Sequence, residues 1–69
     1  MPIIQVHLLE GRSKNLKKEL IRGLTDTTCA TLGVAPESVR VILQEMDPGH
    51  FGIAGKPFSE RGNPGPAQD

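Results

Sequence analysis

The chain has 69 residues, which allows one small domain and rarely lets a chain bury enough apolar surface to fold alone. Eight basic residues balance eight acidic ones, so the whole molecule lacks the field that attracts nucleic acid or a membrane surface. The single cysteine, Cys29, excludes an intrachain disulfide, and His7 and His50 are too few and too far apart for a metal motif, so neither a metal nor a cofactor is expected.

Pro2 directly follows the initiator methionine, and removal of Met1 would convert its amide nitrogen into a secondary amine. An internal proline nitrogen has no lone pair to offer, whereas a free terminal amine titrates near pH ~8 and can take a proton. Burial or neighbouring cations lower the pKa of such an amine toward the range in which a general base works at neutral pH. A proline here is also simply compatible with processing at a mobile terminus, so both readings stay open at this point.

Residues 2–9 are predicted to form a strand, because apolar side chains recur at every second position. Residues 4, 6 and 8 give this strand one uniformly apolar face, and residues 3, 5 and 7 give the opposite face. His7 is interpreted as structural, as is His50, because the sequence places no carboxylate or nucleophile beside either histidine.

A helix is predicted from Ser13, a good N-cap, to about Leu32, and Gly33 supplies the stop. Its apolar face is marked by residues at helical spacing, namely Leu16, Leu20, Leu24 and Thr28. The densest basic group lies along the exterior of this helix and comprises Lys14, Lys17, Lys18 and Arg22. A solvated face explains this group better than a binding surface does, and Cys29 is most simply a small packing residue.

Residues 38–46 alternate like the first strand and are predicted to form a second strand. Because a helix of about 18 residues lies between them, the two strands should be parallel and joined by a right-handed crossover. The expected fold is a single β-α-β unit of the α/β (α+β) class over residues 1–56, with a turn at residues 47–49 and a short hairpin or loop at residues 51–55. Residues 57–69 are rich in proline and glycine and are expected to be a flexible tail unless a partner subunit pins them.

Two strands and one helix leave both strand edges and one sheet face uncovered. Pairing two copies would give a four-stranded sheet with two helices, and the remaining apolar face would favour further association. No run of the sequence approaches the about 20 apolar residues that a membrane helix needs, and no basic leader precedes the first strand. A cytoplasmic oligomer without membrane contact is therefore expected.

Several separated segments, in this order, resemble the 4-oxalocrotonate tautomerase family. They are PIIQVH (2–7), LEGRS (9–13), SVRVI (38–42), EM (45–46) and GHFGI (49–53). The resemblance covers residues 2 to about 56 and implies a tautomerase that ketonises a dienol dicarboxylate such as 2-hydroxymuconate to a conjugated 2-oxo acid. It also implies a homo-oligomer, a hexamer built as a trimer of dimers. The tail departs from the usual short basic end of the family.

By this resemblance Pro2 is the general base, Arg40 stabilises charge that develops near the reacting carboxylate and 2-oxygen, and Arg12 holds the far carboxylate. In the family both arginines reach the proline from neighbouring subunits. Phe51 matches an aromatic residue that walls the pocket and, by lowering its dielectric, favours the neutral amine. The backbone of Leu9 matches a family contact made through ordered water.

The residues alone leave other interpretations open. Arg40 could face solvent on its strand, Arg12 could be a solvated loop residue, and Phe51 could fill a core or an interface. A hydratase-like dehalogenase of the same superfamily would need a carboxylate near Ile53, and an aliphatic side chain cannot take a proton from water. The third class is a non-enzymatic assembly module that recruits partners through its Pro-rich tail, and a free N-terminal proline would favour the enzymes over it.

Overall fold

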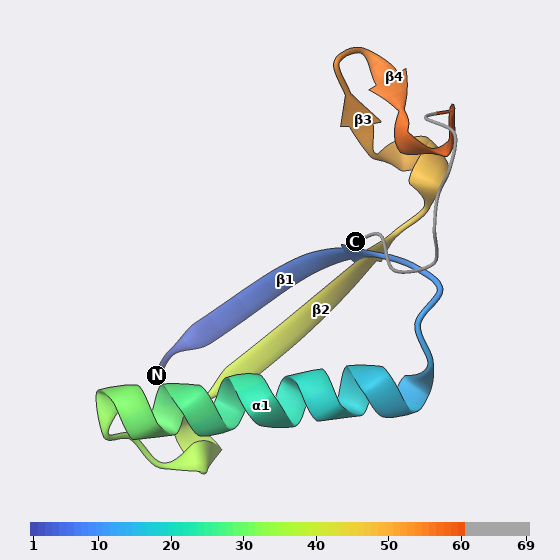
Figure 1. Cartoon of the computed structure of the whole chain (residues 1–69). Coiled ribbons are helices and arrows are strands. Elements are labelled where there is room, and N and C mark those ends of the chain that lie inside the picture. The colour runs from blue at the N-terminus through green and yellow to red at the C-terminus, as the bar shows by residue number, and fades with distance from the viewer. Residues whose placement is uncertain (61–69) are drawn as a thin grey trace.

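The computed structural model describes residues 1–60, and residues 61–69 lie outside the described part of the chain. The strands and the helix are β1 (Ile3–Leu9), α1 (Lys14–Leu32), β2 (Arg40–Met46), β3 (Gly52–Ile53) and β4 (Lys56–Pro57). Single 3-10 turns lie at η1 (Pro36–Ser38), η2 (Pro48–His50) and η3 (Phe58–Glu60). The predicted β-α-β unit with a short C-terminal hairpin is thus confirmed (Figure 1).

Helix α1 begins and ends where the sequence predicted. The Ser13 hydroxyl accepts a hydrogen bond from the N–H of Leu16 at 3.2 Å, which satisfies one unpaired donor of the first turn. At the other end Gly33 takes a left-handed conformation with φ of 71°, and its N–H donates to the Cys29 carbonyl at 2.9 Å. Both ends are therefore set by local chemistry.

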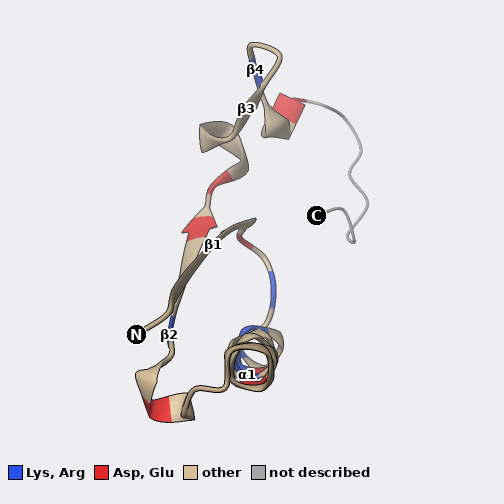
Figure 2. Cartoon of the chain, turned by 90° about the vertical axis from the view of Figure 1, so that its left-hand side faces the viewer, with Lys and Arg blue, Asp and Glu red and all other residues tan. Residues whose placement is uncertain are grey.

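The two main strands pair in parallel, with Ile3 opposite Arg40 and Leu9 opposite Met46. Helix α1 covers one face of this sheet (Figures 1 and 2). The opposite face is open, because Ile3 and Ile42 are 63% and 46% exposed. Among the described residues only Leu9 and Val39 count as buried hydrophobic residues, so one copy of the chain holds a very small core.

One residue of the predicted apolar helix stripe, Leu16, is 60% exposed and not packed against the sheet. Leu20, Leu24 and Thr28 are half-buried, as the spacing predicted. Leu32, in the last turn of the helix, is exposed as well.

Strand β2 begins at Arg40, so the prediction that the strand starts at Ser38 was wrong by two residues. The N–H and the hydroxyl of Ser38 both donate to the Ala35 carbonyl, at 3.0 and 2.9 Å, and the N–H of Val39 donates to the Pro36 carbonyl at 3.1 Å. Because Pro36 fixes its own φ near the value of a helical turn, these donors serve the turn instead of the strand ladder.

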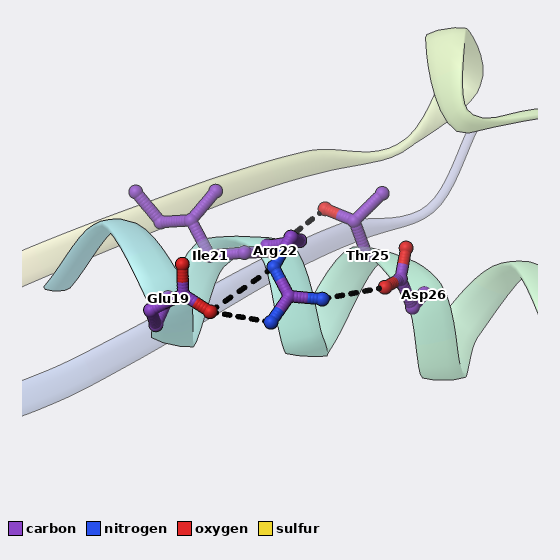
Figure 3. Close-up of polar contacts among 5 residues, drawn as sticks. All are labelled: Glu19, Ile21, Arg22, Thr25 and Asp26. Carbon is purple, nitrogen blue, oxygen red and sulfur yellow. Dashed lines mark hydrogen bonds and ion pairs between the residues drawn. The ribbon is translucent and has the colours of Figure 1, made fainter. Parts of the chain in front are cut away.

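The exterior of α1 is a solvated, internally paired face. Arg22 donates to the carboxylates of Glu19 and, at 3.3 Å, Asp26, and all three side chains are exposed (Figure 3). The hydrogen bond and the charge of Glu19 raise the pKa of Arg22 above its ordinary value. On the side facing the sheet, Lys17 Nζ contacts Glu45 Oε2 at 3.0 Å and joins the helix to β2. Lys14, Lys18 and Arg22 are exposed, in line with the solvated-face interpretation, whereas Lys17 is half-buried and departs from it.

The β3–β4 hairpin projects away from the β-α-β unit and gives the chain an elongated shape of 42 × 24 × 15 Å (Figure 1). The radius of gyration is 14.8 Å, whereas a compact chain of this length has about 11 Å. The hairpin turn is formed by Ala54 and Gly55, whose φ angles of 54° and 85° are those of a type I′ turn. Such an arm has little to pack against in one copy.

The predicted boundary between a domain over residues 1–56 and a tail over residues 57–69 falls inside β4. Pro57 pairs with Gly52 in the hairpin, and residues 58–60 form η3. The flexibility predicted for the end of the chain concerns residues 61–69, which lie outside the described residues.

Candidate active site

Pro2 lies immediately before β1 and is half-buried. Its carbonyl accepts a hydrogen bond from the N–H of Arg40 at 3.0 Å, which fixes its backbone at the amino end of the sheet. Its nitrogen is joined to Met1, which is 74% exposed. The peptide bond that must be cleaved to free the amine is thus at the surface.

Arg40 lies at the same end of the sheet as Pro2, and it is the first residue of β2. It shares the open face of the sheet with Ile3 and Ile42, because paired residues of neighbouring strands point to the same side. Its Nη1 donates to the Glu37 carbonyl at 2.6 Å, so turn η1 holds the guanidinium from one side. A guanidinium carries five N–H donors in a planar fork, which leaves donors for a carboxylate.

Leu9 and Arg12 lie at the opposite end of β1. Arg12 Nη1 donates to the Leu9 carbonyl at 3.1 Å, and the half-buried Arg12 side chain thereby folds back on the end of the strand. Gly11 allows this return because its φ is 123°, a region that side chains rarely adopt. The N–H of Glu10 donates to the Met46 carbonyl at 3.0 Å, so this turn is also tied to the end of β2.

Phe51 is positioned by the hairpin arm, beyond the carboxyl end of β2 and directly before β3. It is 36% exposed. Its ring contacts that of Phe58, with centroids 6.2 Å apart and the ring planes at 48°. The sequence reasoning missed Phe58, although the hairpin spacing around Ala54–Gly55 is the signal that would have found it.

Within one chain the candidate site residues form two groups at opposite ends of the sheet. Pro2 and Arg40 lie at the amino end of the sheet, and Leu9, Arg12 and Phe51 lie at or beyond its carboxyl end (Figure 1). The seven residues of β1 span roughly 23 Å, far more than a small dicarboxylate. A single site that uses both groups must therefore draw them from different copies of the chain.

Other site chemistries find little support in the described residues. Residues 1–60 hold no group of three or more His, Cys, Asp and Glu side chains that could bind a metal ion. Within the same range no helix combines the length and the apolar character that crossing a membrane requires. Ile53 is half-buried in β3 opposite Lys56, so no carboxylate stands at this position to activate water.

Comparison with known proteins gives matches over nearly the whole chain. Residues 2–61 match the tautomerase family, described as tautomerase enzyme. A probable tautomerase of Ralstonia nicotianae is 52% identical over 64 residues, which cover 93% of this chain and 91% of that protein. A 2-hydroxymuconate tautomerase of Pseudomonas putida is 50% identical over 56 residues, which cover 81% of this chain and 89% of that protein.

A solved structure extends the match to the fold. A heterohexamer 4-oxalocrotonate tautomerase from Chloroflexus aurantiacus superposes with a TM-score of 0.83 at 36% identity, covering 88% of this chain and 98% of that chain. Sequence and fold thus agree over the segment that carries both groups of site residues. The chain belongs to the 4-oxalocrotonate tautomerase family of the tautomerase superfamily and is a tautomerase, an isomerase.

Proposed function

We propose that the chain ketonises a dienol dicarboxylate such as 2-hydroxymuconate to a conjugated 2-oxo acid, with the Pro2 amine as general base. The amine takes the proton of the 2-hydroxyl group, the electrons shift along the diene, and a distant carbon receives the proton back from the prolinium. The proton and electrons balance within the substrate, so the step requires no cofactor. The relative from Pseudomonas putida, which carries the name 2-hydroxymuconate tautomerase, supports this substrate class.

The two arginines have different roles in this proposal. Arg40 binds the reacting carboxylate and the 2-oxygen, where negative charge develops in the dienolate. Arg12 holds the far carboxylate, which carries the same charge before and after proton transfer. The observation that supports this division is their placement at opposite ends of the sheet, with each Nη1 anchored on a backbone carbonyl.

Phe51 and Leu9 complete the proposed site. The exposed ring of Phe51 supplies an apolar wall that disfavours the charged prolinium, and the end of β1 at Leu9 supplies a backbone contact made through water. Both residues belong to the carboxyl-end group, so they serve the Pro2 amine of another copy. A homohexamer, built as a trimer of dimers, is the assembly we propose.

The folded chain is expected to be oligomeric at micromolar concentration. The open sheet face, the small core of one copy and the projecting hairpin all require a partner to cover them. Sedimentation velocity over a range of concentrations, combined with circular dichroism, checks this expectation. A stable, folded monomer under these conditions would contradict it.

A ketonisation assay tests the substrate class. The processed chain should convert 2-hydroxymuconate with a higher kcat/KM than a monoacid analogue, because the analogue lacks the far carboxylate that Arg12 is proposed to bind. Ultraviolet absorbance follows the loss of the dienol directly. If the monoacid reacts equally well, the second carboxylate site is not used and the dicarboxylate proposal fails.

A further inference from the structure

Phe51 and Phe58 are the only aromatic residues of the sequence, and they contact each other at the base of the hairpin arm. Their ring centroids lie 6.2 Å apart, inside the range of about 4.5 to 7 Å that is typical of aromatic pairs. The N–H of Phe58 donates to the Phe51 carbonyl at 2.7 Å. The two residues are therefore linked through both ring and backbone.

The register of the hairpin sets this contact. Ile53 pairs with Lys56 and Gly52 pairs with Pro57, so the next pair toward the base is Phe51 with Phe58. Hydrogen-bonded and non-hydrogen-bonded pairs alternate in an antiparallel ladder. Pro57, which has no N–H, stands in a non-hydrogen-bonded pair, and Phe58 stands at the next position, where its N–H donates across the hairpin. Directly opposite side chains in such a ladder lie on the same face, which brings the two rings together.

The two rings differ in their surroundings. Phe58 is half-buried, whereas 36% of the surface of Phe51 is exposed on the projecting arm. On the other side of Phe51 the chain is anchored by turn η2, in which the Asp47 carboxylate accepts from the N–H of Gly49 at 2.7 Å. Phe58 thus backs Phe51, and Phe51 presents its exposed surface away from its own hairpin partner.

We infer that Phe58 is a positioning residue for the tautomerase reaction, which holds the ring of Phe51 in place as the apolar wall beside the Pro2 amine of another copy. This inference rests on the proposed function, because it requires Phe51 to face that amine. Without the backing ring, Phe51 gains rotamer freedom and water enters beside the amine. Water favours the charged prolinium, so the pKa of the amine rises.

The test uses the processed full-length chain and compares pH profiles of kcat/KM for 2-hydroxymuconate. Phe58→Ala should shift the acidic limb of the profile to higher pH by about half a pH unit to one pH unit, because the Phe51 ring that disfavours the charged amine is held less firmly. It should also lower kcat by about tenfold, since displacing a group that shapes a site by a small distance costs up to about a hundredfold. Phe58→Tyr keeps the ring pair and should behave like the wild type.

Two further variants make the comparison specific. Ser59→Ala changes the next residue of η3, which is exposed, and should leave the profile unchanged. Phe51→Ala should shift the acidic limb at least as far as Phe58→Ala does, and the double variant should shift it no further than Phe51→Ala alone, because both act through one ring. Sedimentation verifies that each variant is assembled.

The outcomes separate this inference from the proposed function. If Phe51→Ala shifts the limb while assembled Phe58→Ala keeps the wild-type limb and kcat, Phe58 has no positioning role and the inference is overturned. If Phe51→Ala itself leaves the limb unchanged, the apolar-wall role in the proposed function is wrong. Should Phe58→Ala fail to assemble, Phe58→Leu preserves most of the volume without the ring pair, and wild-type behaviour of that variant would overturn the inference.

Discussion

A chain that retains Met1 is expected to lose most of its tautomerase activity, whereas the processed chain of the same sequence is active. Met1 turns the Pro2 nitrogen into an amide with no lone pair to accept a proton. General-base catalysis typically contributes about a hundredfold to ten-thousandfold, so the loss of kcat/KM should fall in that range. The measurement is steady-state ketonisation by the two forms, each verified by intact mass.

Two controls accompany this comparison. Sedimentation and circular dichroism should show the same assembly for both forms, because Met1 is exposed and the Pro2 carbonyl keeps its hydrogen bond to Arg40. Pro2→Ala in the processed chain keeps a primary amine in nearly the same place and should retain partial activity. Equal activity of the Met1-retaining and processed chains would mean that the base lies elsewhere.

Arg40→Ala is expected to lower kcat and kcat/KM, whereas Arg12→Ala should mainly raise KM. The reason is that Arg40 meets charge that develops during proton transfer, and Arg12 meets a carboxylate whose charge stays constant. Loss of one charge-assisted contact, worth roughly 1.5 to 3 kcal/mol, corresponds to about ten- to hundredfold in rate or affinity. Steady-state kinetics with 2-hydroxymuconate separates the two effects.

Arg22→Ala is the matched control for this pair. Arg22 is an exposed arginine whose partners, Glu19 and Asp26, lie on its own helix (Figure 3). This variant should keep wild-type kcat and KM. If Arg40→Ala and Arg12→Ala also keep wild-type kinetics while they stay assembled, those two arginines are ordinary surface charges.

Local chemistry explains how much of the fold the sequence predicted. Ser13 and Gly33 mark the helix ends because a cap is decided by one side chain or one φ angle. The alternation of residues 2–9 predicted β1 to within one residue for a similar reason. The start of β2 was predicted too early because the N–H groups of Ser38 and Val39 donate within the turn η1 that Pro36 begins. The alternation of apolar residues does not reveal that this turn competes with strand pairing for these two groups.

The parts that the sequence did not predict depend on distance across the fold. Leu16 has the right spacing for the core, yet it is 60% exposed although its neighbour Lys17 contacts Glu45 of β2. Phe58 was assigned to a flexible tail, whereas the register of a two-residue hairpin turn places it opposite Phe51. The position of Arg40 beside Pro2 likewise emerges only when the two strands are paired in register.

Subunit complementation tests most directly the central claim that one active site is shared between copies of the chain. Met1-retaining chains, which supply Arg12 but no amine, are mixed in equal amounts with processed Arg12→Ala chains, unfolded together and reassembled. At substrate concentrations below KM, random mixing should restore about a quarter of the wild-type activity per site, because a quarter of the sites combine an intact amine with an intact Arg12 of another copy. No activity above that of the two parent proteins, in mixed oligomers verified by mass, would mean that Pro2 and Arg12 do not meet across subunits and would contradict the account.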